Sequence, residues 1–193
     1  MTNKGTFDVS AARARCRQHR RRILDISQTV SALHIAPAFS CMEIVDTIYY
    51  GLMRRDRGPN ADDSFIISKG HGSLAQYAVL ESLGIVSKAE LDLYGKPGGR
   101  FATHPDYGLP GIEASTGSLG HGLNLAVGMA AADKVRRADR VVFVVGETNF
   151  RSQKALRKIG ASFLKKVQLP GADGTMMPNL VFAIRRQAYL PKI

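Results

Sequence analysis

The sequence contains little cysteine: Cys16 and Cys41 are the only two in 193 residues. Two cysteines at this separation match neither a disulfide framework nor the ligand spacing of a metal site, which indicates plain thiols in a reducing compartment. No uninterrupted apolar run approaches the roughly 20 residues that a membrane span needs, and the N-terminal MTNKGTFDVS lacks the apolar core of a signal peptide. We therefore expect a soluble, cytoplasmic protein with no membrane partner.

Acidic residues are also scarce: 16 Asp and Glu face 27 Lys and Arg, which gives a formal net charge of +11. A positive field attracts phosphates, nucleic acid or anionic membranes without choosing among them. The excess lies mainly in residues 13–22 and after Phe150. Such a run is most often a solvated helix face. A basic nucleic-acid-binding module is a minor alternative, because no zinc-finger, RNA-recognition or helix-turn-helix pattern supports it and the aromatic residues are scattered.

The pattern of apolar residues predicts several helices. After residue 20 they recur at three- and four-residue steps, which predicts a helix that ends near His34. Ser40 and Glu43 form a capping-box pattern, so a second helix should start near Cys41. A further helix is predicted from Leu74 to about Leu83, and an alanine-rich one to about residue 134. The Gly- and Pro-rich residues 95–112 predict a long ordered loop.

Short apolar runs predict strands between these helices. They are 65–68 and 141–145. The continuous run 141–145 is typical of a strand buried on both faces of a parallel sheet. At this length the chain can bury one core, so we expect a single domain over 1–193 of α/β class, with three α/β/α layers, a mainly parallel sheet and an incomplete C-terminal end.

Glycines and histidines in loops are the candidate functional residues. The glycine cluster at 117–122 could serve tight turns or let backbone N–H groups approach a phosphate. Four histidines, each singly more typical of a structural role, lie at Gly- or Pro-rich turns: His34, His71, His104 and His121. Loops at the carboxyl ends of parallel strands converge on one crevice, so we expect these histidines to share a site.

The order of four motifs resembles the N-terminal domain of transketolases. The motifs are SALH at 31–34, SKGHG at 68–72, THP at 103–105 and GIEASTGSLGHG at 111–122. The resemblance is strongest to the N-terminal section of split transketolases, whose two halves are separate chains. It covers roughly residues 15–146, whereas residues 147–193 form a divergent tail. It implies the thiamine-diphosphate-binding fold.

The resemblance also implies roles for individual residues. Catalytic His34 and His104 would lie near the reactive carbon and the sugar, where they steer protons and hold hydroxyl groups. The implied residues that bind thiamine diphosphate are His71, Gly117, Ser118, Leu119 and Gly146. Lys69 could neighbour a phosphate or be a solvated loop lysine. Loop histidines suit proton transfer near neutral pH, which this cofactor's chemistry needs.

The expected magnesium site departs from the family pattern. Family members carry a Gly-Asp-Gly motif after the strand, whereas this chain reads Gly146-Glu147-Thr148-Asn149. Glu147 keeps the carboxylate on a longer arm, and magnesium demands near-ideal octahedral geometry. Residues 179–184 resemble the next strand of the family. Gln187, which follows two arginines, falls near the position of a second ligand, an asparagine. A divergent protein and a non-native tail after Gly146 are both compatible with these changes.

The resemblance implies part of an enzyme: the N-terminal section of a transketolase-like transferase that moves a two-carbon ketol unit between sugar phosphates. The chain holds no pyrimidine-binding domain, so the expected partner is a C-terminal transketolase subunit, with which it forms an oligomer. The alternative is a catalytically inactive or truncated transketolase-like interaction protein, which the changes at Glu147 and Gln187 motivate.

Overall fold

The computed structural model describes residues 7–31, 33–55, 63–135, 140–170 and 175–185. They fall into two compact units, Met1–Gly122 and Leu123–Ile193. The single domain expected over residues 1–193 stays a prediction. No helix among the described residues is long and apolar enough to cross a membrane.

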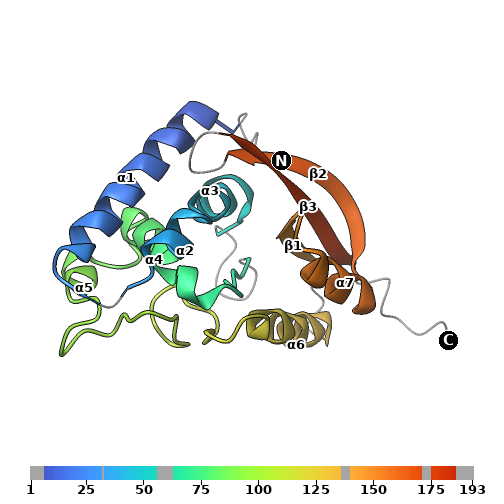
Figure 1. The fold of residues 1–193 in the computed structure, drawn as a ribbon. Helices are drawn as coiled ribbons and strands as arrows, with labels where there is room; N and C mark the ends of the chain where they lie inside the picture. Colours follow the sequence, from blue (N-terminus) through green and yellow to red (C-terminus); the bar gives the residue numbers. More distant parts are fainter. Residues whose placement is uncertain (1–6, 32, 56–62, 136–139, 171–174, 186–193) are drawn as a thin grey trace. The chain divides into compact units, whose positions relative to one another are not determined.

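The first unit is helical, and helix α4 (Ser73–Ser82) lies at its centre (Figure 1). It contacts α1 (Val9–Ser27), α2 (Ile35–Phe39), α3 (Met42–Thr47) and α5 (Lys88–Asp92). A π-helical turn, η1 (Ile48–Leu52), follows α3, and a 3-10 turn, η2 (Gly70–Gly72), precedes α4. Residues 73–80 of α4 are all buried, as expected for a helix that is surrounded by others.

Helix α1 differs from the prediction at both ends. It starts earlier, because the Asp8 side chain caps it by accepting from the Ser10 and Ala11 amides. It ends at Ser27, so the predicted end near His34 was wrong. Val30 and Leu33 still pack against the core, but from the loop that follows the helix. Apolar residues can thus keep a helical spacing without being helical.

Some of the other predictions for the first unit are confirmed and others are wrong. Helix α3 follows Cys41 as expected, but the Ser40–Glu43 capping box is not formed, because Glu43 pairs with Arg20 instead. Residues 65–68 are not a strand. Ile67 is buried in an extended loop, where its carbonyl accepts from the Thr116 hydroxyl. The long loop over 95–112 is confirmed: this stretch contains no helix or strand.

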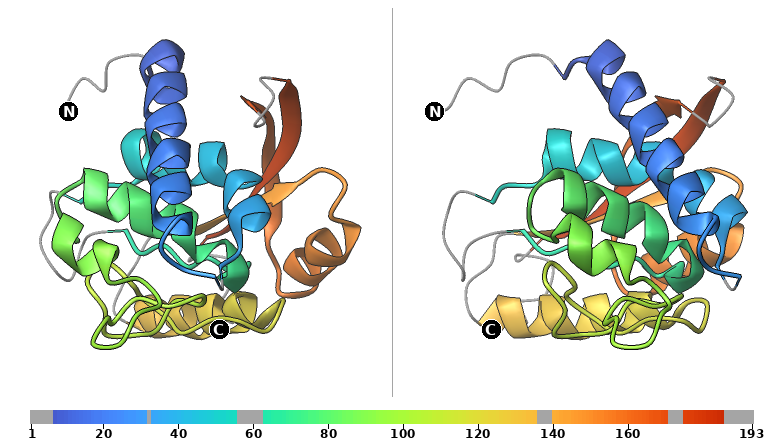
Figure 2. Two further views of the ribbon diagram at one scale, coloured as in Figure 1. Left: turned by 60° about the vertical axis from the view of Figure 1, so that its left-hand side comes forward. Right: turned by 90° about the vertical axis from the view of Figure 1, so that its left-hand side faces the viewer.

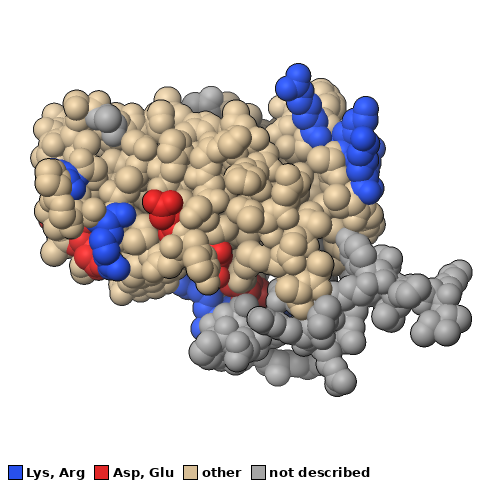
Figure 3. All heavy atoms as spheres, turned by 90° about the horizontal axis from the view of Figure 1, so that it is seen from below, with Lys and Arg blue, Asp and Glu red and all other residues tan. Residues whose placement is uncertain are grey.

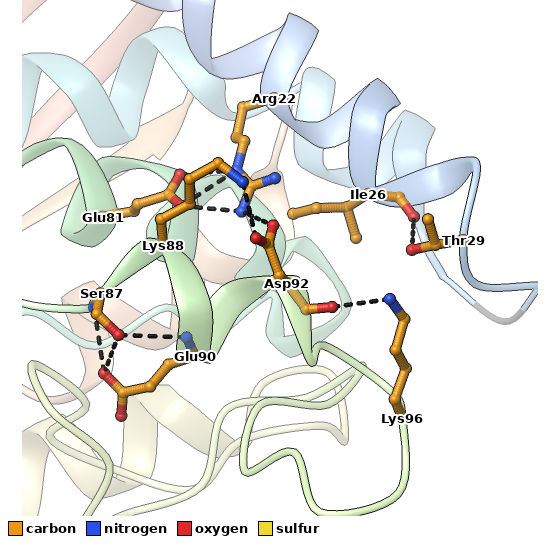
Figure 4. Close-up of polar contacts among 9 residues, drawn as sticks. All are labelled: Arg22, Ile26, Thr29, Glu81, Ser87, Lys88, Glu90, Asp92 and Lys96. Atoms are coloured by element: carbon orange, nitrogen blue, oxygen red, sulfur yellow. Dashed lines mark hydrogen bonds and ion pairs between the residues drawn. The ribbon is translucent and has the colours of Figure 1, made fainter.

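Ion pairs tie α1 to its neighbours. Figure 4 shows Arg22 of α1 reaching Glu81 of α4 at 2.9 Å and Asp92 of α5 at 2.7 Å. Arg15 pairs with the fully buried Asp46 of α3 at 2.8 Å. Half of the arginines in the basic run 13–22 therefore hold the unit together. Figure 3 marks Lys and Arg side chains in blue, and Asp and Glu side chains in red, on one face of the molecule.

The second unit combines helices with a small sheet. Helix α6 (His121–Val135) leads into it, and β1 (Arg140–Gly146), α7 (Phe150–Lys158), β2 (Ser162–Pro170) and β3 (Met176–Arg185) follow. Figure 2 gives two further views of these elements. The core of this unit consists of Leu156, Ala161, Phe182 and Ile184. The predicted helix to about residue 134 and the strands at 141–145 and 179–184 are confirmed.

The sheet has the order β1-β3-β2, and both of its strand pairs are antiparallel. The α/β class is thus borne out, but the mainly parallel sheet is not what residues 140–185 form. Only residues 171–175 separate β2 from β3, and a parallel crossover needs a dozen residues or more. Residues 143–146 of β1 are only half-buried, so the prediction of a strand buried on both faces was wrong.

Candidate functional site

Three of the predicted histidines lie together in the first unit. The ring centroid of His34 is 5.9 Å from that of His71 and 6.0 Å from that of His104. The imidazoles of His34 and His104 are exposed, and that of His71 is partly buried. No such ring contact joins His121 to them within the described part of the chain. The three rings are named the histidine cluster below.

The first two members come from the starts of short helical elements. His34 is the residue that precedes α2, and His71 is the middle residue of the η2 turn that leads into α4. Neither side chain is fixed by a regular helix or strand of its own. Their separation therefore depends on how α2 and η2 are packed against each other.

His104 is held through the backbone of its loop. The Ser73 hydroxyl donates to the Thr103 carbonyl at 3.1 Å, and the Tyr77 hydroxyl donates to the His104 carbonyl at 3.0 Å. Ser73 and Tyr77 are four residues apart, so they lie on one face of α4. This buried helix thus positions the loop, and polar residues in an otherwise apolar helix were the signal that sequence reasoning missed.

The glycine loop packs against the same place. The Thr116 amide donates to the Pro105 carbonyl at 3.2 Å, which joins this loop to the one that carries His104. A Cβ atom on Gly70 would lie 2.7 Å from backbone atoms of Thr116 and Gly117, and one on Gly117 would lie 3.4 Å from the His104 ring. Glycine is thus required at Gly70 by the close approach of backbone, whereas a Cβ atom on Gly117 would only touch the His104 side chain.

The rest of the glycine loop leads into α6. Ser118 and Leu119 are exposed, and the Ser118 carbonyl accepts from the amide of His121 at 3.1 Å. Gly120, at a φ of 89°, forms the turn. Ser118 and Leu119 therefore leave their side chains open to solvent directly after the segment that contacts His104.

The environment of His71 favours its neutral form. Burial lowers the pKa of His71, and the positive charge of Lys69 and the neighbouring His34 and His104 lower it further. A neutral imidazole offers one nitrogen as a donor and the other as an acceptor. His71 can thus exchange hydrogen bonds with a bound molecule near neutral pH without a change of charge.

The two cysteine thiols stay protonated near neutral pH. Burial raises the pKa of Cys16 to about 12 and that of Cys41 to about 11. A thiol must lose its proton to act as a nucleophile or a metal ligand, so both side chains stay inert at neutral pH. This agrees with the absence of a predicted role for them.

The expected metal ligand Glu147 lies in the second unit, where it already has a partner. Gly146 ends β1, and the Glu147 carboxylate accepts from the Lys166 ammonium of β2 at 2.6 Å. No group of three or more His, Cys, Asp or Glu side chains that could hold a metal ion exists in the described ranges. Gln187 lies outside the described residues. A hard divalent cation would have to compete with the Lys166 ammonium for the Glu147 carboxylate.

The histidine cluster, by contrast, fits the reactive end of thiamine diphosphate. That cofactor needs proton-transfer groups near neutral pH and backbone that approaches it closely. The cluster supplies the His34 imidazole and two others whose centroids lie about 6 Å from it. Gly117 places bare backbone against one of them. The residues present thus suit the organic part of the cofactor, while no described side chains suit its metal.

Comparison with known proteins supports this fit. Residues 13–141 match the family described as transketolase, thiamine diphosphate binding domain. The chain is 36% identical over 142 residues to an apulose-4-phosphate transketolase subunit of Phocaeicola vulgatus, and the match covers 72% of this chain and 50% of that protein. It is 34% identical over 116 residues to 6-deoxy-6-sulfo-D-fructose transketolase subunit SqwG of a Clostridium species, covering 58% and 42%.

A longer relative gives the same result. The chain is 34% identical over 141 residues to the transketolase of Rhodobacter capsulatus, and the match covers 66% of this chain and 21% of that protein. This chain therefore spans half or less of the length of each of these relatives. The family match covers well over half of the chain and includes every member of the histidine cluster. The chain belongs to the transketolase family, through its thiamine diphosphate binding domain.

Proposed function

We propose that this chain is the thiamine diphosphate-binding subunit of a transketolase-like transferase, which moves a two-carbon ketol unit between sugar phosphates. The observation that carries the proposal is the histidine cluster, in which His34 lies within 6.0 Å of both His71 and His104. The names of two relatives, each one subunit of a transketolase, support a role as one part of a larger enzyme. The name of the first also supports a sugar-phosphate substrate.

In this proposal each histidine has a distinct task. His71, whose neutral form is favoured by its lowered pKa, exchanges hydrogen bonds with the cofactor. His34 and His104 are exposed and their ring centroids lie 6.0 Å apart. They hold hydroxyl groups of the sugar and transfer protons. When bound, thiamine diphosphate supplies the carbanion through its ylid.

The glycine loop completes the proposed cofactor site. Gly117, Ser118 and Leu119 offer backbone groups to the cofactor, since Gly117 already abuts the His104 ring. Gly146 belongs to the diphosphate end. The family's three-layer arrangement with a mainly parallel sheet stays an expectation, and the proposed site does not depend on it. The loops that carry the histidines converge around α4.

A C-terminal, pyrimidine-binding transketolase subunit is the proposed partner, and the active form is an oligomer with it. Calorimetry of the purified chain with thiamine diphosphate and magnesium, in the presence and absence of this partner, tests the proposal. We expect binding in its presence. His71→Ala should weaken that binding about 10-fold, which corresponds to the loss of one hydrogen bond worth about 1.4 kcal/mol.

Variants of the two exposed histidines separate binding from chemistry. His34→Ala and His104→Ala should leave cofactor binding intact and lower ketol transfer by roughly 10²–10⁴-fold, the usual share of a general acid or base. Gln18→Ala on the exposed face of α1 is the matched control and should behave as the wild type. Full transfer activity in both histidine variants would contradict the proposed roles.

A catalytically inactive interaction protein is the second candidate, and the Glu147–Lys166 ion pair favours it. In that case the chain keeps the family's fold and its partner surface but binds no metal. The same calorimetry decides between the two. Binding of thiamine diphosphate that depends on magnesium refutes the inactive form, and failure to bind under either condition refutes the enzyme.

A further inference from the structure

The Lys69 side chain makes two hydrogen bonds that the sequence did not predict. Its ammonium group donates to the Pro37 carbonyl at 3.1 Å and to the Ser40 hydroxyl at 2.6 Å. Within the described ranges it forms no ion pair with a carboxylate. Two of the three ammonium donors are thus committed to neutral oxygens of the protein, where a phosphate-binding lysine would keep them for its ligand.

Both acceptors lie at the C-terminal end of α2. Ser40 directly follows the last residue of that helix, and the Pro37 carbonyl belongs to its final turn. The last carbonyls of a helix have no intrahelical partner, and a cation near them is favourable. The Cys41 thiol also donates to the Pro37 carbonyl, at 3.3 Å, and lies 3.9 Å from the Gly72 carbonyl. This end of α2 is therefore the place where α2 and η2 are joined.

The two joined elements are the ones that carry His34 and His71. Helix α2 has five residues and begins directly after His34, and η2 has three residues with His71 in the middle. Segments this short are not stable by themselves, so tertiary contacts must set their positions. Lys69 is the residue that immediately precedes η2. Its side chain reaches back to α2 and fixes the one element against the other.

We propose that Lys69 is a positioning residue of the histidine cluster: its ammonium group joins α2 to the η2 turn and thereby sets the separation of the His34 and His71 imidazoles. This deepens the proposed function and rests on it only for its catalytic consequence. A second effect follows from the same placement. The fixed positive charge disfavours protonation of His71, which faces Lys69, His34 and His104.

The experiment uses the isolated full chain and needs neither cofactor nor partner. Imidazole signals of His34 and His71 are followed by NMR across pH, together with the nuclear Overhauser effect between their ring protons. In Lys69→Met we expect loss of that effect and a rise in the pKa of His71. Lys69→Arg keeps the charge and a donor, so it should restore the low pKa. The pKa of His71 rises with loss of the charge in any case, whereas a role in phosphate binding alone would leave the Overhauser effect unchanged.

Lys96→Met is the matched control. The Lys96 ammonium also donates to a backbone carbonyl, that of Asp92 at 2.8 Å (Figure 4), but it makes no contact with the histidine cluster. It should leave both signals unchanged. If folded Lys69→Met keeps the wild-type contact between the His34 and His71 rings, the proposal is overturned, whatever the pKa of His71.

A second variant covers the case in which Lys69→Met does not fold. Ser40→Ala removes the closer of the two acceptors at an exposed position and keeps the ammonium group. It should weaken the contact between the His34 and His71 rings. An unchanged contact in folded Ser40→Ala overturns the proposal. Failure of cofactor binding in the calorimetry, with these NMR results as expected, would remove the proposed function and leave the positioning role intact.

Discussion

Replacement of Gly70 by alanine tests whether the glycine and histidine loops are packed as tightly as described. The added Cβ would lie 2.7 Å from the Gly117 nitrogen and from the carbonyl carbon and oxygen of Thr116. Relief to about 3.5 Å requires a shift of roughly 0.8 Å. The atoms that must move are backbone, and Thr116 is held by hydrogen bonds to Ile67 and Pro105 at 2.8 and 3.2 Å. We expect Gly70→Ala to lower the free energy of unfolding by about 1–3 kcal/mol.

Urea denaturation followed by circular dichroism measures this loss, and NMR of His104 reports whether the loops move. The His104 signals should shift, because Gly117 abuts that ring. Gly128→Ala is the matched control. Its Cβ meets nothing within 4 Å and it lies in α6, so it should raise the free energy of unfolding by up to about 1 kcal/mol. Wild-type stability and unshifted His104 signals in Gly70→Ala would refute the close packing.

Two further predictions concern the interface of α1 with α3 and α4. Asp46 is fully buried beside Arg15. Asp46→Leu should therefore cost about 3–5 kcal/mol by leaving the arginine unpaired, and Arg15→Met in the same chain should recover most of that loss in urea denaturation. Burial lowers the pKa of His19, against the opposing charge of Asp46. The unfolded chain then takes up the proton first, so the free energy of unfolding should fall as the pH drops below about 6.5. His19→Leu should flatten that part of the pH profile, and an unchanged slope would contradict the assignment.

Sequence reasoning located the histidine cluster because the relevant motifs are short and ordered along the chain. His34, His71 and His104 each lie at a turn, and turns fix where a side chain emerges even when neighbouring elements are misjudged. The apolar stretches of α4 and β1 were also assigned to the correct type of element. In such stretches burial and backbone hydrogen bonding favour the same structure.

Contacts between segments far apart in the chain could not be predicted from the sequence. The end of α1 was misjudged because Val30 and Leu33 reach the core from a loop. Residues 65–68 were expected in a strand, but the Ile67 carbonyl is instead bound by Thr116, 49 residues away. Lys69 was left undecided because its acceptors on α2 lie about 30 residues back along the chain. Each case depends on a tertiary partner that no local pattern reveals.

The second unit differs from the expectation in two ways, the antiparallel sheet and the ion pair of Glu147, and both have one physical origin. Because β2 and β3 are joined by only residues 171–175, the chain must fold back and the pair must be antiparallel. This hairpin presents Lys166 of β2 to the residue that follows β1, where Glu147 accepts from it. The ion pair is exposed and contributes at most about 1 kcal/mol to stability, so stability alone does not require it. Its consequence is chemical: the carboxylate expected to bind magnesium is already neutralised. A magnesium site that uses Glu147 must therefore first displace Lys166 from that carboxylate.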